Sequence, residues 1–247
     1  MKVFLTGASS GIGEALARHY AGRGATVGLV ARRRAMLEAL AAGLPSPSTI
    51  HEADVRDAQA MRAAAADFIV RHGLPDLVIA NAGVSHGTLT EYEGDADVFR
   101  QILEINVLGL AHAFQPFVGP MREAGRGTLV VVASVAGYRG LPKSLVYGPT
   151  KAALINMAET MYLDLAPRGV AVSVVNPGFV KTPLTAQNEF EMPHIITPEE
   201  AAAEMLAGYG RGEFEIHFPK AFSRKLKLLR LLPYGMYFNA IRKSTGL

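Results

Sequence analysis

Cysteine is absent from all 247 residues of the chain, and long hydrophobic runs are absent as well. The lack of cysteine excludes disulfide bonds, zinc–thiolate sites and thiol nucleophiles. It fits the reducing environment of the cytoplasm, where we expect the protein to be located. Glycine, proline and charged residues interrupt the apolar runs, and none reaches the about 20 residues that a helix needs to cross a bilayer.

The sequence also carries no strong signal for nucleic-acid binding, metal binding or secretion. Its formal net charge of +3 is too small to indicate nucleic-acid binding. No histidine pair or acidic cluster has the spacing of metal ligands, so we predict no metal site. Lys2 and a short apolar run are followed at once by a glycine-rich loop, which predicts a first strand rather than a signal peptide.

Short β-branched runs alternate along the chain with alanine-rich segments of helical length. Strands are predicted over 3–6, 26–31, 48–53, 76–80, 128–133, 170–175 and near 214–218. Helices are predicted over 11–22, 33–42, 58–72, 95–124, 147–166 and near 199–206, with a disturbance at Pro116 and Pro120 because proline lacks the helical amide. Strands such as Leu129-Val130-Val131-Val132 are continuously apolar, which is typical of a parallel sheet covered on both faces. The pattern therefore predicts an α/β protein with an open, doubly wound parallel sheet.

The first predicted strand leads into Thr6-Gly7-Ala8-Ser9-Ser10-Gly11-Ile12-Gly13, where a helix begins. Gly7 permits a sharp turn, Gly11 lets the backbone approach a pyrophosphate, and Gly13 allows close packing of helix on strand. Free amides at the helix start attract phosphate. An ordinary strand–helix turn does not need three spaced glycines, so the motif favours a dinucleotide site over residues Gly7 and Ser9–Gly13.

The second strand ends at Arg32 and Arg33, where an NAD site would carry Asp or Glu to bind the ribose hydroxyl. A guanidinium can bind a 2′-phosphate instead. Three consecutive arginines at the positive end of a helix dipole also indicate an anion nearby. We therefore predict NADP(H) as the preferred cofactor. The alternative is NAD(H), with Arg33 and Arg34 as ordinary surface residues.

Tyr147 and Lys151 are four residues apart and so project from one face of a predicted helix. An ammonium close to a phenol stabilises the phenolate and lowers the phenol's pKa from about 10. Ser134, at the carboxyl end of a central strand, can donate a hydrogen bond to a substrate oxygen beside the phenol. Tyr147 can then protonate that oxygen, or remove its proton in the reverse direction. Each residue alone would usually have a structural or surface role, but their joint occurrence predicts a catalytic site.

Taken together, these motifs resemble the short-chain dehydrogenase/reductase family in its compact, single-domain form. The likeness extends over about residues 1 to 218 and follows the order of the family's motifs. It includes Asn81-Ala82-Gly83, Asn106, Ser134, Tyr147-Gly148-Pro149-Thr150-Lys151, Asn176-Pro177-Gly178 and Thr182. The resemblance implies a single-domain Rossmann fold with about seven strands, and we assign residues 1–247 to one domain. Residues 179–196 lack a clear pattern and are long for a loop, which predicts a substrate lid, and the pattern of residues 219–247 predicts a helical tail.

The resemblance also implies roles for individual residues. Lys151 would bind the nicotinamide ribose in addition to its action on Tyr147, and Asn106 would hold a proton-relaying water. The remaining cofactor contacts would come from Asp54, Val55, Asn81, Ala82, Gly83, Pro177, Gly178, Val180 and Thr182. Asp54 could equally cap the following helix. Ala80 replaces an asparagine of many relatives, which removes one expected loop contact.

The tail from 221 to 241 mixes apolar and basic residues, with Phe222, Leu226 and Leu229 on one helical face and Pro233 at its end. Three interpretations remain open: peripheral membrane contact, a cover over the substrate mouth, and a subunit interface. The family resemblance implies a homodimer or homotetramer.

The leading functional prediction is an NADP(H)-dependent oxidoreductase acting on CH–OH groups or carbonyls of a small-molecule substrate, with Tyr147 as general acid and base. The alternatives are a membrane-peripheral reductase of lipid-like ketones and a catalytically silent NADP-binding regulator.

Overall fold

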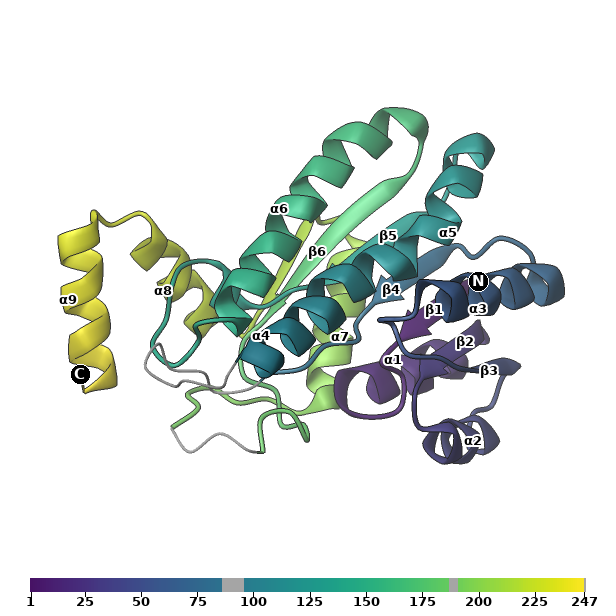
Figure 1. Cartoon of the computed structure of the whole chain (residues 1–247), viewed down its shortest axis with the longest axis horizontal. Helices are drawn as coiled ribbons and strands as arrows, with labels where there is room; N and C mark the ends of the chain where they lie inside the picture. Colours follow the sequence, from purple (N-terminus) through teal and green to yellow (C-terminus); the bar gives the residue numbers. More distant parts are fainter. Residues whose placement is uncertain (86–95, 187–190, 247) are drawn as a thin grey trace.

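The computed structural model describes residues 1–85, 96–186 and 191–246, and it contains one parallel sheet in the order β3-β2-β1-β4-β5-β6-β7. All neighbouring strands of this sheet run parallel. The strands are β1 (Lys2–Thr6), β2 (Thr26–Ala31), β3 (Ser48–Glu52), β4 (Leu77–Ala80), β5 (Thr128–Val132), β6 (Ala171–Pro177) and β7 (Glu215–Phe218). The order reverses between β1 and β4, where a doubly wound sheet opens a crevice at its carboxyl edge. The predicted α/β architecture is confirmed (Figure 1).

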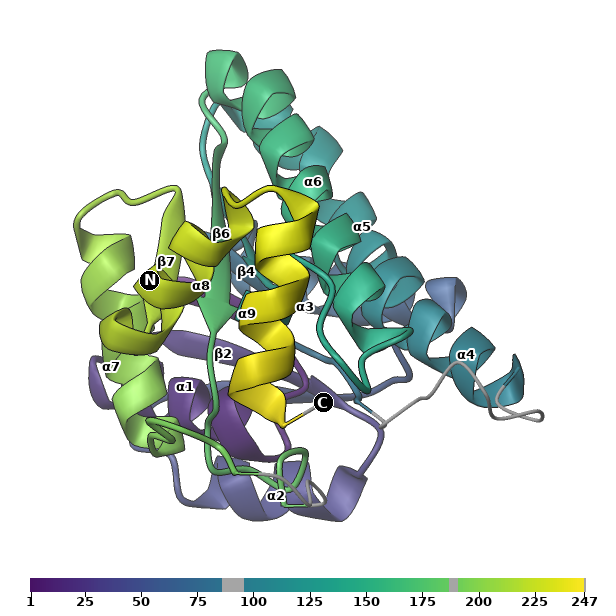
Figure 2. The same ribbon diagram turned by 90° about the vertical axis from the view of Figure 1, so that its left-hand side faces the viewer.

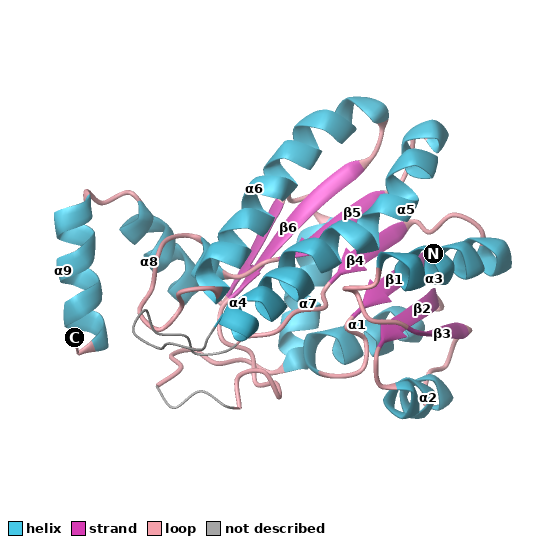
Figure 3. Cartoon of the chain, viewed as in Figure 1, coloured by secondary structure: helices cyan, strands magenta, loops and turns pink. Residues whose placement is uncertain are grey.

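Helices cover both faces of the sheet (Figure 3). One layer consists of α1 (Gly11–Gly22), α2 (Arg34–Ala42) and α7 (Pro198–Gly210). The other consists of α3 (Ala58–His72), α4 (Ala96–Leu103), α5 (Gly109–Ala124) and α6 (Tyr147–Leu165). Successive strand residues alternate between the layers, since Phe4 packs with α3 and α5 whereas Leu5 packs with α1 and α2. Both faces are apolar, which explains the continuous apolar strands.

Side-chain caps fix where two of the helices begin. The Asp57 carboxylate accepts hydrogen bonds from the amides of Gln59 (2.8 Å) and Ala60 (3.0 Å) at the start of α3. At the start of α7, Thr197 and Glu200 bond each other's amides reciprocally. Such caps satisfy amides that have no partner inside the helix. The helix over 58–72 is therefore capped by Asp57 and not by Asp54.

The long predicted helix is interrupted at a different place from the one expected. Pro116 and Pro120 lie inside a regular α5, whereas the irregular turn is a π-helical segment over Glu104–Leu108. There the Gly109 amide donates to the carbonyl of Glu104, five residues earlier. Neither proline is buried, so water can bond the carbonyls that they leave free. The π turn, a feature often found at functional sites, contains buried Asn106.

Among the residues in the described ranges, one helix, Ala96–Ala124, is long and apolar enough to cross a membrane by length and composition. No such run was expected from the sequence. Phe114, Phe117 and Met121 of this helix are fully enclosed in the hydrophobic core against the sheet. Core packing therefore explains part of its apolar character, while Leu103 and Leu108 are exposed.

Beyond β7 the chain forms α8 (Lys220–Arg230) and α9 (Tyr234–Thr245), which confirms the helical tail. Figure 1 places α9 at one end of the molecule, next to α8 and away from α2 and α3, and Figure 2 views the molecule from that end, with α9 in front. The sequence assigned Phe222 and Leu226 to an apolar face, and these residues pack against the core of the protein.

The ends of the predicted lid, 179–196, are tied to each other. Val180 and Ile196 form a parallel bridge. The Lys181 amide donates to the Ile196 carbonyl (2.8 Å), and the Ile196 amide donates to the Phe179 carbonyl (3.1 Å). The segment thus leaves and rejoins the protein at one point, as compact surface loops do. Residues 187–190 of this segment lie outside the described ranges.

Candidate active site

A cleft lies at the carboxyl edge of the sheet, where the loops after the first six strands, β1 to β6, meet. It brings together every predicted cofactor residue except Gly13, and every predicted catalytic residue except Asn106. The shared lining consists of Gly7, Ser9, Ser10, Gly11, Ile12, Arg32, Arg33, Asp54, Val55, Asn81, Ala82, Gly83, Ser134, Tyr147, Lys151, Pro177, Gly178, Val180 and Thr182. Residues separated by up to 175 positions therefore share one surface.

The glycine-rich turn has the backbone geometry that requires glycine. Gly7 and Gly11 have φ angles of +67° and +58°, which L side chains rarely adopt. At Gly13 a Cβ atom would lie 2.1 Å from the carbonyl oxygen of Gly7, so α1 approaches the turn too closely for any side chain. Gly13 therefore contributes through helix packing from behind the cleft.

Asn81 fastens the end of β4 to this turn. Its amide group donates to the carbonyl oxygens of Thr6 (3.1 Å) and Gly7 (3.3 Å). In return, the Thr6 hydroxyl accepts from the backbone amides of Asn81 and Ala82, both at 3.1 Å. These bonds fix the ends of β1 and β4 to each other at the switch point of the sheet.

Arg33, rather than Arg32, reaches the glycine-rich turn. Its guanidinium donates to the hydroxyls of Ser9 (2.8 Å) and Ser10 (2.9 Å). Arg32 is more than half exposed and lies 3.9 Å from the Asp54 carboxylate. Asp54 in turn accepts hydrogen bonds from Arg56, which hold the pKa of its carboxyl below the usual value despite partial burial. A cluster of cations and hydroxyl donors thus borders the cleft beside the turn.

Asn106 and Lys151 approach the cleft from behind Gly83. A Cβ atom on Gly83 would lie 3.3 Å from Oδ1 of Asn106 and 3.4 Å from Nζ of Lys151. The Asn106 amide is held by the Val84 backbone (2.9 and 3.0 Å) and by Thr150 (3.2 Å). Because Asn106 is buried and held by these three bonds, it fixes the loop after β4 against α6. The proton-relaying water that the resemblance implied remains a prediction.

Ser134, Tyr147 and Lys151 converge at the end of β5. Nζ of Lys151 donates to the Val132 carbonyl (3.0 Å) and lies 5.7 Å from the centroid of the Tyr147 ring. The Ser134 hydroxyl accepts from the amide of Ala136 (3.1 Å) and is hydrogen-bonded to the Tyr147 phenol. A hydroxyl, a phenol and an ammonium therefore face one small region of the cleft.

The titration behaviour of this group differs from the sequence-based expectation. Burial raises the pKa of the Tyr147 phenol, and the hydrogen bond with Ser134 opposes that rise only in part. Burial also lowers the pKa of Lys151 to about 8. The expected lowering of the phenol's pKa by the neighbouring ammonium does not dominate, because desolvation penalises both charged forms. In this state the phenol keeps its proton at neutral pH.

The loop after β6 closes the far side of the cleft. The Gly178 amide donates to the carbonyl of Phe218 (2.7 Å), and Thr182 lies so close to Gly11 that a Cβ there would be 2.9 Å from its Cγ2 atom. Thr185 holds this turn by donating to the carbonyl of Val180 (2.6 Å) and accepting from the Thr182 amide (3.0 Å). Thr185 also lines the cleft. Sequence reasoning missed it, although its spacing of three from Thr182 is typical of a hydroxyl-stabilised turn.

A second missed feature is Glu215, at the start of β7. Its carboxylate accepts from the Tyr138 phenol (2.7 Å) and the Asn176 amide (2.9 Å), and it pairs with Lys227 of α8. Burial alone would raise the pKa of Glu215, but hydrogen bonds from Lys227, Tyr138 and Asn176 lower it overall. Glu215 therefore connects the segment after Ser134, the end of β6 and the helical tail through one ionised group.

Comparison with known proteins agrees with these features. The family model for short chain dehydrogenases matches residues 1–192. An uncharacterised oxidoreductase of Myxococcus xanthus is 37% identical over 244 residues, which cover 97% of this chain and 95% of the relative. A short-chain dehydrogenase from Streptomyces avermitilis superposes with a TM-score of 0.83 at 25% identity, covering 98% of this chain and 93% of that one. An alcohol dehydrogenase from Thermococcus sibiricus, complexed with 5-hydroxy-NADP, has a TM-score of 0.79 at 26% identity and covers 88% of this chain and 95% of its own.

Proposed function

Because the chain belongs to the short-chain dehydrogenase/reductase family of oxidoreductases, we propose that it uses NADP(H) to interconvert a carbonyl and an alcohol, with Tyr147 as the general acid and base. The observation that carries this proposal is the convergence of Ser134, Tyr147 and Lys151 on the cleft that also holds the glycine-rich turn. A proton-transfer group and a phosphate-binding turn on one cleft are what hydride transfer to a carbonyl requires.

The residues around the turn fit a dinucleotide. Gly7 and Gly11 line the cleft in left-handed conformations beside the start of α1, whose first amides have no partner within the helix. Ser9, Ser10 and Arg33 supply hydroxyl and guanidinium donors next to them. The alcohol dehydrogenase from Thermococcus sibiricus, complexed with 5-hydroxy-NADP, supports the same class of cofactor.

Arginine in place of an acidic residue after β2 favours NADP(H) over NAD(H). A carboxylate there would repel a 2′-phosphate, whereas Arg33 can donate two parallel hydrogen bonds to it. Its present bonds go to neutral hydroxyls of Ser9 and Ser10. A doubly charged phosphate is a stronger acceptor than either hydroxyl, so the same guanidinium would bind it without a change in the fold.

The state of the phenol suits the reductive direction. Burial keeps the Tyr147 oxygen protonated, so it can donate that proton to a substrate oxygen, while the Ser134 hydroxyl donates a second hydrogen bond. The nicotinamide, when bound, supplies the hydride. Lys151 is held by the Val132 carbonyl close to the phenol, and its positive charge stabilises the phenolate that forms after the proton has left.

A panel of aldehydes and ketones, assayed with NADPH and with NADH by the loss of reduced-nicotinamide absorbance, tests the proposal. We expect turnover of at least one carbonyl class, with higher kcat/KM for NADPH. Tight NADPH binding without turnover of any member, together with no oxidation of the matching alcohols, would contradict the proposed activity and favour a regulatory nucleotide-binding role.

A further inference from the structure

The charge of the chain is strongly segregated. Residues 216–247 contain seven of the 25 basic residues and none of the 22 acidic ones, so the rest of the chain is net negative although the whole carries +3. Five of these basic side chains are exposed on the two tail helices, namely Arg224, Lys225, Arg230, Arg242 and Lys243. The tail helices therefore present a cationic surface at one end of an otherwise acidic molecule.

The same helices expose large apolar side chains. Their exposed fractions are 68% for Leu228, 79% for Leu231, 71% for Tyr234, 59% for Met236 and 49% for Phe238. All five lie between the end of α8 and the middle of α9. They are distinct from Phe222 and Leu226, which face the core, so the exposed set is left over after the tail has packed against the protein.

The exposed apolar and basic residues lie on shared helix faces. Arg224 and Leu228 of α8 and its C-cap residue Leu231 are separated by four and three positions, so they share one face. On α9, Tyr234 and Phe238 are four apart, with ring centroids 5.7 Å from each other, and Arg242 follows four residues later. Apolar residues thus occupy the junction of the two helices, and cations lie at both outer ends. We call the surface formed by these six residues the tail patch.

We propose that the tail patch docks on an anionic lipid membrane. Its apolar residues would enter the interface between headgroups and acyl chains, while the flanking cations contact negative headgroups. A twofold contact between two copies of this chain fits less well, because it brings the same cations of both copies together, and residues 216–247 contain no carboxylate side chain to offset them.

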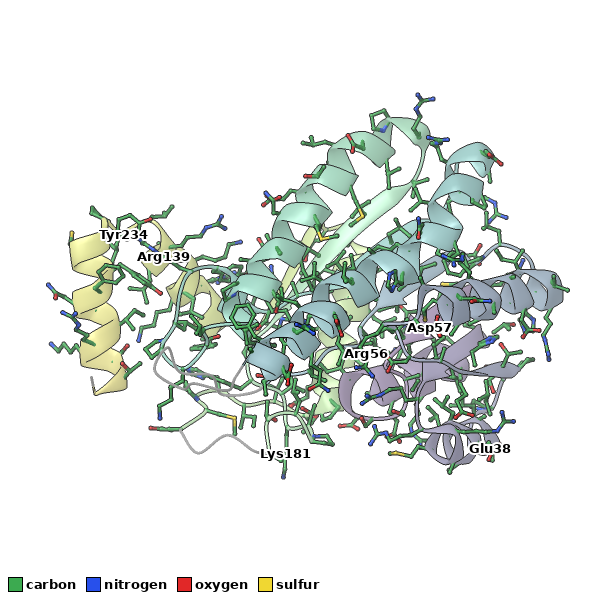
Figure 4. The ribbon with its side chains drawn as sticks, viewed as in Figure 1. Glu38, Arg56, Asp57, Arg139, Lys181 and Tyr234 are labelled. Atoms are coloured by element: carbon green, nitrogen blue, oxygen red, sulfur yellow. The ribbon has the colours of Figure 1, made fainter. Side chains whose placement is uncertain are left out.

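Arg139 fixes the tail patch relative to the active site. This residue lies in the segment between Ser134 and Tyr147, and its guanidinium donates to the carbonyl oxygens of Leu229 (3.3 Å), Arg230 (3.1 Å) and Leu232 (2.6 Å) at the end of α8. It also stacks on Tyr234 and on Tyr237, at 4.8 and 4.1 Å from the ring centroids (Figure 4). A docked tail would therefore hold the active-site segment at a defined orientation to the membrane.

Co-sedimentation of the intact protein with lipid vesicles tests the docking. We expect binding to vesicles of phosphatidylcholine and phosphatidylserine in equal parts, weak binding to phosphatidylcholine alone, and loss of binding as salt is added. The double variant Leu231→Ser, Phe238→Ser removes apolar contact, and Arg224→Glu, Arg242→Glu reverses the charge of the two cations of the tail patch. Each should lower the partition coefficient on the anionic vesicles by about tenfold or more.

Matched variants elsewhere on the surface serve as controls. Val70 and Leu163 are 85% and 72% exposed on α3 and α6, so Val70→Ser, Leu163→Ser tests loss of apolar surface alone. Arg122→Glu, Arg168→Glu makes the same change in net charge away from the tail. Both controls should bind the anionic vesicles as the wild type does, and carbonyl reductase activity in solution should be unchanged in all four double variants.

Two outcomes would overturn membrane docking. One is equal binding of the tail and control variants to the anionic vesicles, since the tail patch would then not be the contact. The other is the absence of wild-type binding to the anionic vesicles. This absence could also come with a change from oligomer to monomer, by light scattering, in Leu231→Ser, Phe238→Ser. That result would assign the tail patch to a contact between copies of the chain. Neither outcome depends on whether the proposed reaction is correct.

Discussion

Nζ of Lys151 donates a 3.0 Å hydrogen bond to the carbonyl oxygen of Val132, so the ammonium is anchored to strand β5 and not to the phenol beside it. The two are close enough for charge to matter, since Nζ lies 5.7 Å from the centroid of the Tyr147 ring. The strand therefore places a buried cation next to a protonated phenol. This arrangement makes the titration of Lys151 measurable as a pH-dependent change in stability.

Lys151 is expected to make folding stability rise with pH above about 8. Burial lowers the pKa of Lys151 to about 8 in the folded protein, from an ordinary value of 10.5. Between these two values the unfolded chain binds more protons than the folded one, so the free energy of unfolding increases with pH. The variant Lys151→Met lacks this titration.

Urea unfolding of both proteins measures the effect. The stability of the wild type relative to Lys151→Met should rise by up to about 3 kcal/mol as the pH increases from 8 to 10.5 and stay constant below that range. Subtracting the variant removes the contribution of tyrosines that are distant from Lys151. A constant difference over the whole range would show that Lys151 keeps an ordinary pKa and is not desolvated.

Arg33 is expected to determine the preference for NADP(H). Its guanidinium is directed at Ser9 and Ser10, whereas Arg32 is more than half exposed and lies 3.9 Å from Asp54. The variant Arg33→Ala should raise the KM for NADPH by about 10- to 100-fold, the equivalent of a lost charge-assisted contact, and leave the KM for NADH nearly unchanged. Arg32→Ala is the matched control and should have the smaller effect. Equal effects of the two variants on NADPH would refute the assignment.

A methyl group at Gly83 should disturb catalysis more than stability. The Cβ of Gly83→Ala would lie 3.3 Å from Oδ1 of Asn106 and 3.4 Å from Nζ of Lys151, so both polar groups must shift by tenths of an ångström. Because small misplacements of catalytic groups are costly, kcat should fall by about tenfold.

Gly119→Ala provides the control for the Gly83 variant. Nothing lies within 4 Å of a Cβ at this position in α5, so this variant should keep full activity and gain up to about 1 kcal/mol in stability. If Gly83→Ala retained the wild-type kcat, the space in front of Asn106 and Lys151 would have no catalytic importance.

The sheet and the order of the motifs could be predicted because they depend on local signals. A short stretch of sequence is enough to identify the continuous apolar strands, the three glycines after β1 and the spacing of Tyr147 and Lys151. The parallel topology then brings the carboxyl ends of β1, β4 and β5 to one edge without further information. These features account for most of the cleft lining.

The features that could not be predicted depend on contacts between distant segments. The π turn at Glu104–Leu108 has no proline or glycine signal of its own before Gly109. The hydrogen bonds that distinguish Arg33 from Arg32 depend on how β2 packs beside the glycine-rich turn. Glu215 has its role only because β7 pairs with β6, and the direction of the pKa shift of Tyr147 follows from burial, which its helical spacing does not reveal.

Replacement of the Tyr147 phenol by a benzene ring tests the central claim most directly. Tyr162→Phe, on the exposed side of the same helix, is the matched control. With NADPH and a carbonyl substrate that the wild type reduces, Tyr147→Phe should lower kcat by about 100- to 10,000-fold, while the affinity for NADPH, measured by fluorescence titration, stays at the wild-type value. Substantial turnover by Tyr147→Phe, at a rate close to that of Tyr162→Phe, would show that another group delivers the proton.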